Sequence, residues 1–257
     1  MTLANLRAAA DAAARAGAAV VAERFGEVRE LRHKGLPGDW VSAADLAAET
    51  AVRAVLAERT PEIPVLGEEF GGELAELVWI VDPLDGTTNF LHGFPAVGVS
   101  VGLVEAGDPV VGAVHAPLLG EEYLAARGLG ATRNGVPMAV SDRPIDQAIV
   151  ATGFPFRRKD THLDGYLTAF SAVLGSVEDL RRVGAATLDL AWTAAGILDG
   201  FFELSLAPWD VAAGACLVRE AGGVVTDWTG DAHSWLTSGN IVAGPPGVHA
   251  GLVDLIG

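Results

Sequence analysis

The stretch LVWIVDPLDGTTNF occupies residues 77–90, and in it a run of apolar residues stops at two carboxylates. The apolar run predicts a buried strand from Leu77 to Val81, and a proline and a glycine then predict a turn directly after it. Because the ends of a four-residue turn lie within about 7 Å, Asp82 and Asp85 can aim at one point. This spacing is typical of a metal site; the alternative is a capped turn in which both carboxylates accept backbone N–H groups.

The ligand chemistry of this stretch favours a hard cation. Oxygen ligands without a nearby Cys or a pair of His residues suit Mg²⁺ before Ca²⁺ or Mn²⁺, and Mg²⁺ in proteins usually works beside substrate phosphate. Gly86, Thr87 and Thr88 follow at a predicted helix start, where backbone N–H groups and hydroxyls accommodate an anion. The stretch therefore predicts a metal with a phosphate beside it.

Two further motifs stand at suitable places in the chain. Gly67-Glu68-Glu69 ends an apolar strand predicted for Ile63 to Leu66, and Pro208-Trp209-Asp210 opens a predicted helix far downstream. The combination of GEE, WIVDPLDGTTNF and PWDVAAG with a closing EAGG resembles the inositol monophosphatase family of Mg²⁺-dependent, lithium-sensitive phosphatases. The resemblance runs from about residue 3 to the C-terminus.

The order of the predicted elements is that of an α/β protein. The helices are expected at Leu3–Phe25, from Ser42 to about Arg59, and at 161–174, 185–198 and 211–221; the strands at 27–33, 40–41, 149–151, 177–183 and 201–204, near Val224 and Ile241, and in an antiparallel meander over 96–126, with tight turns at 35–38 and 134–135. The resemblance implies an α-β-α-β-α five-layered sandwich. It also implies an N-terminal half, 1–141, with the antiparallel sheet and most metal ligands, tightly joined to a C-terminal half, 142–257, with the active site between them.

The composition limits the classes of partner that the protein can bind. Half of the 257 residues are hydrophobic, which excludes a disordered chain, and the net charge of −16 disfavours nucleic acid and anionic membranes. The single Cys216 excludes an internal disulfide and cannot form a structural zinc site by itself. Without a signal peptide or a run of 18 apolar residues, a cytoplasmic protein is expected, and the resemblance implies a homodimer.

Several side chains admit two interpretations. Asp45 stands three residues after Ser42, which is the spacing of a capping box, but it also ends the family pattern K-x-x-P-x-D-x-V-x-x-x-D that begins at Lys34 and includes Pro37, Asp39 and Val41. Glu203 is either the exposed end of a strand or, by resemblance, a ligand of substrate hydroxyls. The run Arg157-Arg158-Lys159 is either a solvated surface or a second phosphate site. The six His residues are scattered without ligand spacing, which favours surface or packing roles.

The resemblance assigns roles residue by residue. It implies two or three Mg²⁺ ions, with Mn²⁺ as a possible substitute, held by Glu68, Asp82, Asp85, Asp210 and the carbonyl of Leu84, with Asp45 near a weaker third position. It assigns catalysis to Glu68, Thr87 and Asp82, and substrate binding to Asp85, Gly86, Thr87, Gly184, Ala185, Ala186, Glu203 and Asp210. The family usually has Ser or Thr where Ala185 stands, so a side-chain contact to the sugar is absent here.

The predicted function is hydrolysis of a small polyol phosphate, first of all inositol 1-phosphate, by water activated by the metal. Histidinol phosphate, fructose 1,6-bisphosphate and nucleotide phosphates remain alternative substrates. Phosphatases of the haloacid dehalogenase type are disfavoured because they need D-x-D, and Asp82 and Asp85 are three residues apart. A regulatory protein of the same fold that binds a protein partner predicts the loss of a metal ligand, and none is lost. A Ca²⁺-binding module lacks its D-x-D-x-D-G loop.

Overall fold

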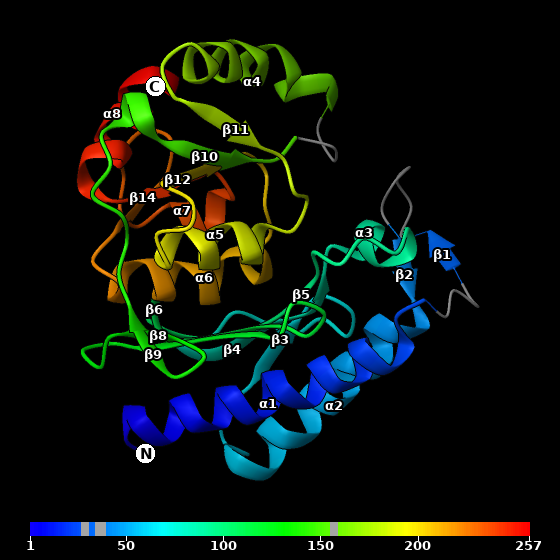
Figure 1. Cartoon of the computed structure of the whole chain (residues 1–257). Helices are drawn as coiled ribbons and strands as arrows, with labels where there is room; N and C mark the ends of the chain where they lie inside the picture. The colour runs from blue at the N-terminus through cyan, green and yellow to red at the C-terminus, as the bar shows by residue number, and fades with distance from the viewer. Residues whose placement is uncertain (27–30, 34–39, 155–158) are drawn as a thin grey trace.

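The chain folds into five alternating layers of helices and sheets (Figure 1). The computed structural model describes residues 1–26, 31–33, 40–154 and 159–257. Helices α1 (Leu3–Arg24) and α2 (Ala43–Arg59) form one outer layer. A seven-stranded sheet follows, then the middle helices α5 (Ala186–Ala194) and α6 (Pro208–Glu220), then a five-stranded sheet, and finally α4 (Lys159–Leu174) and α8 (Pro246–Ile256). The expected five-layered sandwich is confirmed.

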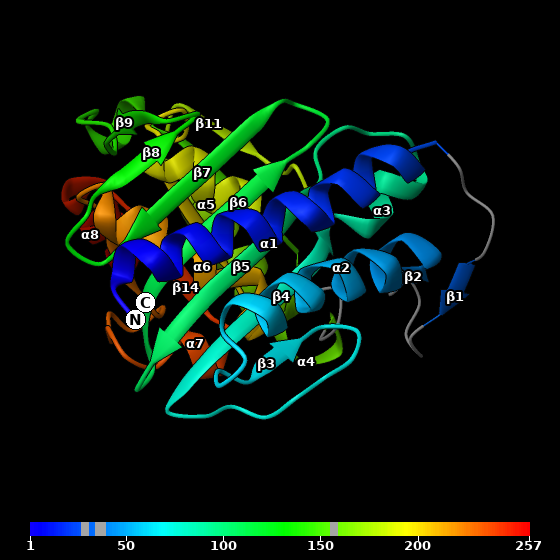
Figure 2. The ribbon, with the colours of Figure 1, turned by 90° about the horizontal axis from the view of Figure 1, so that it is seen from below.

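The larger sheet contains the predicted meander. Its strand order is β3-β4-β5-β6-β7-β8-β9, with β3 parallel to β4 and every later pair antiparallel. Figure 2 shows α1 and α2 running across its outer face. The strands are β3 (Val65–Gly67), β4 (Leu77–Asp85), β5 (Gly98–Glu105), β6 (Asp108–Ala116), β7 (Glu121–Ala126), β8 (Ala131–Arg133) and β9 (Val136–Met138). Asn134 and Gly135, both with positive φ, form the predicted turn between β8 and β9.

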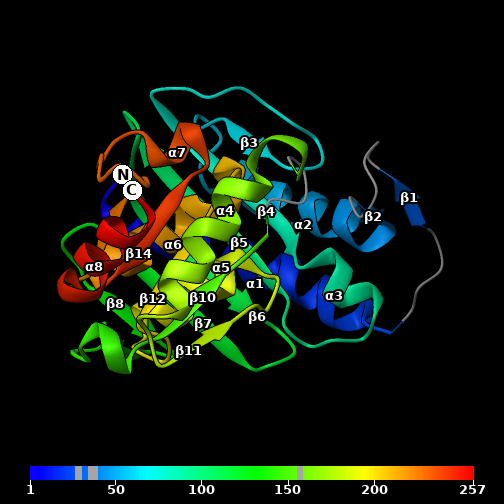
Figure 3. The same ribbon diagram turned by 90° about the horizontal axis from the view of Figure 1, so that it is seen from above.

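The smaller sheet has the order β11-β10-β12-β14-β13 and is covered by α4 and α8 (Figure 3). Its strands are β10 (Ile149–Thr152), β11 (Asp179–Arg181), β12 (Gly200–Glu203), β13 (Val224–Thr226) and β14 (Ile241–Gly244). Helix α5 is shorter than the predicted 185–198 because Gly196, with φ +67°, ends it in a left-handed turn. The strand predicted over 177–183 is likewise shortened to β11. Helix α8 was not predicted.

Close packing of α6 against the larger sheet depends on two glycines. A Cβ on Gly102 of β5 would lie 2.8 Å from the backbone nitrogen of Ala213, and one on Gly112 of β6 would lie 2.4 Å from its carbonyl oxygen. The sheet therefore lets the helix backbone approach directly. Helix α6 is buried from Asp210 to Val218, and its side chains belong to the core cluster that joins the two sheets. This packing fixes the start of α6, which carries Asp210, over the end of β4.

The remaining elements are short: β1 (Leu31–His33), β2 (Trp40–Ser42), α3 (Thr87–Leu91), the 3₁₀ turn Ile145–Gln147 and α7 (Trp235–Ser238). Strands β1 and β2 pair antiparallel, as the predicted strands around the 35–38 turn require. Several predictions concern positions outside the described residues: the turn itself, residues 27–30, Lys34, Pro37, Asp39, Arg157 and Arg158. Among the described helices, none is long and apolar enough to cross a membrane. The division into halves at residue 141 stays a prediction.

Candidate metal centre

A β-bulge, rather than a turn, brings the two carboxylates of the central stretch together. The predicted turn after Val81 is wrong, because β4 continues to Asp85. Asp82 pairs with Ser100 and Asp85 with Gly98, so three steps on β4 match two on β5. In a regular strand, residues three apart face opposite sides, and the extra residue of the bulge puts both side chains on the same side. Gly86, with φ +85°, then turns the chain into α3.

A third carboxylate, that of Asp210, comes from the middle helix α6. Asp82, Asp85 and Asp210 each offer one oxygen, and these oxygens all lie within 4.8 Å of one another. Asp210 is the third residue of α6 and buried. Three of the predicted metal ligands, from distant parts of the chain, are therefore brought to one point.

Hydrogen bonds hold one oxygen of each carboxylate. Asp82 Oδ1 accepts from the Leu84 backbone N–H at 3.0 Å. Asp85 Oδ2 accepts from both the backbone N–H and the hydroxyl of Thr187 at 2.7 Å each. Asp210 Oδ2 accepts from the Ala207 N–H at 2.7 Å, which closes the N-terminus of α6. These contacts fix the orientation of all three side chains before any ion arrives.

The electrostatics of the cluster fit a hard cation. Burial, followed by the charges of Glu68, Asp85 and Asp210, holds the pKa of Asp82 well above its usual value. Burial raises the pKa of Asp85 to about 6, against the hydrogen bonds from Thr187 that favour its charged form. Buried like charges at this distance are costly unless a cation neutralises them. An all-oxygen donor set of this kind suits Mg²⁺, Mn²⁺ or Ca²⁺.

Glu68 lies beside this cluster, in the turn after β3, and α2 holds that turn. The Glu68 charge raises the pKa of Asp45, Asp82 and Asp85, so its carboxylate is near all three. The buried Glu49 of α2 accepts from the backbone N–H groups of Glu69 at 2.7 Å and Phe70 at 3.3 Å. No motif marks Glu49, which in sequence is only one more charged residue of a predicted helix.

Asp45 forms the capping box of α2, as one of its two interpretations predicted. Its Oδ2 accepts from the Ser42 backbone N–H at 2.8 Å and from the Ser42 hydroxyl at 2.6 Å. The Thr87 hydroxyl lies 3.1 Å from Asp45 Oδ1 and 3.1 Å from the Leu84 carbonyl oxygen. Asp45 thus orients Thr87, and a role for Asp45 at a third metal position stays a prediction.

The predicted substrate residues line up beside Gly86. Gly184 has φ +87° and Ala185 is the N-cap of α5. A Cβ on Gly86 would lie 3.4 Å from the Ala185 Cβ, so the start of α5 faces the start of α3. The Asn89 amide, which the sequence analysis missed, ties them together by donating to the carbonyls of Ala96 at 2.8 Å and Val183 at 3.1 Å.

Two further acids lie beside this row: Glu203, which is partly buried, and Asp189, which is buried. Burial, followed by the charges of Asp189 and Asp210, holds the pKa of Glu203 well above its usual value. The Glu203 carboxylate packs where a Cβ of Gly153 would otherwise be, at 2.0 Å. Asp189 lies on α5 and is buried. Its pKa is also raised, first by burial and then by the charge of Asp85. Asp189 was not predicted, because in sequence it is one polar residue in an apolar helix.

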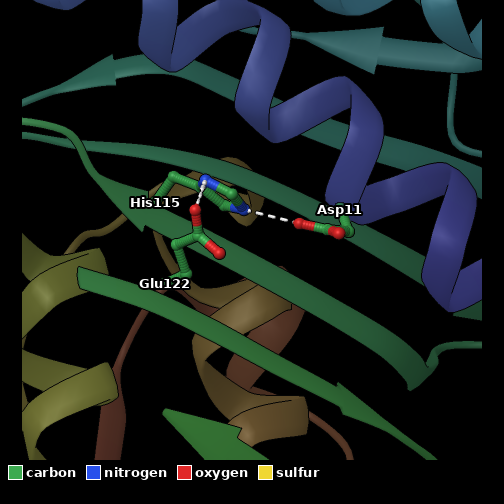
Figure 4. Close-up of side chains that lie close together, drawn as sticks. All are labelled: Asp11, His115 and Glu122. Carbon is green, nitrogen blue, oxygen red and sulfur yellow. Dashed lines mark hydrogen bonds and ion pairs between the residues drawn. The ribbon is translucent and has the colours of Figure 1, made fainter. Parts of the chain in front are cut away.

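A second cluster of possible ligands lies under α1 (Figure 4). The ring of the buried His115 lies between Asp11 and Glu122, with its Nε2 2.9 Å from Asp11 Oδ1. Arg15 donates to both carboxylates, so its guanidinium already neutralises part of their charge. These contacts tie α1 to β6 and β7, which agrees with the packing role expected for the histidines.

Comparison with known proteins places the chain in one family. The sequence pattern of the inositol monophosphatase family matches residues 2–256. A protein of Pseudomonas aeruginosa named Nus factor SuhB is 46% identical over 213 residues, which cover 80% of this chain and 78% of the relative. The inositol-1-monophosphatase of Mesorhizobium japonicum is 42% identical over 238 residues, with coverage of 90% and 88%.

Solved structures agree with the sequence matches. The inositol monophosphatase of Anabaena superposes with a TM-score of 0.90 at 35% identity and covers 100% of this chain and 96% of its own. Mycobacterium tuberculosis SuhB superposes with a TM-score of 0.81 at 34% identity, with coverage of 98% and 96%.

Proposed function

Because the chain belongs to the inositol monophosphatase family, we propose that it is a metal-dependent phosphomonoesterase acting on a small polyol or sugar phosphate, with inositol 1-phosphate as the first candidate. The observation that carries this proposal is the convergence of Asp82, Asp85 and Asp210 from distant parts of the chain. A structural role alone does not require three carboxylates at one point, two of them buried, because their repulsion costs stability.

The proposed cation is Mg²⁺, in two or three positions. Glu68, Asp82, Asp85, Asp210 and the Leu84 carbonyl would hold it, and bound ions would neutralise charge on a phosphoryl group and lower the pKa of water. Asp45 acts through its contact with Thr87 and by its charge near a weaker third position.

The remaining residues position substrate and water in this proposal. Glu68 and the Thr87 hydroxyl orient the attacking water, since both lie beside the carboxylate cluster. Gly86 and Thr87 face the phosphate. Glu203 and the turn Gly184-Ala185-Ala186 bind the polyol hydroxyls, since they lie beside Asp210 and Gly86 respectively.

Release of inorganic phosphate tests the proposal. Purified protein with Mg²⁺ is assayed against inositol 1-phosphate, fructose 1,6-bisphosphate, histidinol phosphate, and 2′- and 3′-nucleotides. We expect the highest kcat/KM for the inositol ester, inhibition by Li⁺, and loss of turnover in Asp210→Asn. Activity confined to histidinol phosphate or a nucleotide would change the substrate, and no activity on any ester would overturn the enzyme assignment.

A second candidate function is supported by the names of several relatives. Proteins 42–46% identical to this chain are called Nus factor SuhB, so a regulatory role of the same fold through a protein partner is an alternative. A variant without turnover separates the two functions. If Asp210→Asn complements a deletion strain, a regulatory role is supported. If the parent protein complements the strain and Asp210→Asn does not, catalysis is supported.

The other expectations keep the status of proposals. We propose a homodimer located in the cytoplasm that binds neither nucleic acid nor membrane. Light scattering tests the dimer, and a gel-shift assay with RNA and DNA tests the charge argument from the net −16.

A further inference from the structure

One oxygen of the Asp85 carboxylate accepts two hydrogen bonds from the same residue. An oxygen of a carboxylate has two lone pairs, and Asp85 Oδ2 receives two donors at 2.7 Å, the backbone N–H and the hydroxyl of Thr187. Both lone pairs of this oxygen are therefore occupied. Only the other oxygen, Oδ1, remains for a cation.

The two donors have different origins. The Thr187 N–H is one of the unpaired donors of the first turn of α5, whose N-cap, Ala185, provides no side-chain hydrogen bond. Asp85 thus caps α5 from a distant strand, and any residue at position 187 except proline would supply that N–H. The hydroxyl depends on Thr187 itself.

Strand β5 leaves space for this hydroxyl. Gly98 is the residue that pairs with Asp85, and a Cβ on Gly98 would lie 2.8 Å from Thr187 Oγ1. Thr187 is fully buried, so no solvent competes for the hydrogen bond. The Thr187 hydroxyl therefore occupies space that is open only because residue 98 is glycine.

We propose that Thr187 is a positioning residue that makes Asp85 a one-oxygen ligand and thereby selects the smaller cation. Mg²⁺ takes six ligands in near-ideal octahedral geometry and needs one oxygen from each carboxylate, whereas Ca²⁺ takes six to eight ligands and commonly uses both oxygens of a carboxylate. Blocking Oδ2 removes a ligand that Ca²⁺ can use and Mg²⁺ does not need. The inference rests on the metal centre of the proposed function and adds the residue that sets its ion preference.

Calorimetric titration of the metal-free protein with Mg²⁺ and with Ca²⁺ tests the inference without substrate. Thr187→Val keeps the shape and removes the hydroxyl; we expect the ratio of the Kd for Ca²⁺ to the Kd for Mg²⁺ to fall by about three- to tenfold. Thr187→Ser restores the hydroxyl and should keep the parent ratio. In the Ca²⁺ complex of Thr187→Val, infrared carboxylate bands should shift toward two-oxygen coordination.

A second variant approaches the same hydrogen bond from the opposite side. Gly98→Ala displaces the hydroxyl while position 187 remains Thr, because the added Cβ would lie 2.8 Å from Thr187 Oγ1, and we expect it to lower the ratio in the same direction. An unchanged ratio in both Thr187→Val and Gly98→Ala overturns the inference, and so does a Thr187→Ser variant that behaves like Thr187→Val. If the parent protein binds neither cation, the metal centre itself is refuted; phosphate release then decides the proposed function separately.

Discussion

Replacing Asp85 by Asn should stabilise the metal-free protein while it removes activity. The amide oxygen of Asn can still accept from Thr187, and the side chain no longer carries a charge beside Asp82 and Asp210. The pKa of Asp85 is raised from 3.8 to about 6, and a shift of about 2 units corresponds to about 3 kcal/mol of penalty on the charged form. We therefore expect the variant to gain about 1–3 kcal/mol in the free energy of unfolding at pH 7 without metal.

The sign of this effect depends on pH and on metal. The raised pKa means that the penalty exists above pH 6 and disappears as the pH falls through 6 toward 4, so the gain should shrink over that interval. With Mg²⁺ at a hundred times its Kd, the parent gains about 2.7 kcal/mol by binding and the variant gains less. The order of stability should then reverse or become equal.

Urea denaturation followed by tryptophan fluorescence measures both conditions, in EDTA and in Mg²⁺. Asp142→Asn, at an exposed position, is the matched control and should change neither result. If Asp85→Asn is less stable than the parent in EDTA at pH 7, the cluster is not electrostatically strained and the reasoning fails. If it also retains near-full turnover with saturating Mg²⁺, Asp85 is not a metal ligand.

Three further outcomes are expected. Thr87→Ala should lower kcat about a hundredfold while the Kd for Mg²⁺, measured by calorimetry, stays within twofold, because the hydroxyl positions water. Gly112→Ala should cost about 1–3 kcal/mol in urea denaturation, because its Cβ would lie 2.4 Å from the Ala213 carbonyl oxygen. Burial lowers the pKa of His115, so the unfolded chain binds more protons and stability should fall as the pH drops below about 6.5. His115→Gln can still form a hydrogen bond with Asp11, and it should make the melting temperature less dependent on pH between 7.5 and 5.

Local patterns predicted the elements that carry the site, because those elements depend on short-range chemistry. The capping box at Ser42, the helix opened by Pro208 and the meander after residue 96 follow from residues a few positions apart. The ends of elements were harder to predict. The bulge between Asp82 and Asp85 has no local signal, since the extra residue is defined only against the partner strand β5.

The missing parts of the candidate site are residues whose partners lie far away in the chain. Thr187 meets Asp85 across 102 positions, and Asn89 meets Val183 across 94. Asn89 lies within the quoted stretch 77–90, but nothing in that stretch indicates its partner, and Thr187 belongs to no quoted motif. Glu49 was missed for the same reason, because it supports the Glu68 turn through backbone groups that any residue could supply.

The burial of α6 between the two sheets has a consequence for folding. This helix faces β4, β5 and β6 on one side and the smaller sheet on the other, so neither sheet covers it alone. A fragment that ends near residue 141 would expose the apolar face of its sheet to water and should aggregate when it is expressed without the rest of the chain. The intact protein should melt in one transition, and the amides from Val211 to Val218 should exchange last with deuterium, at the rate of global unfolding.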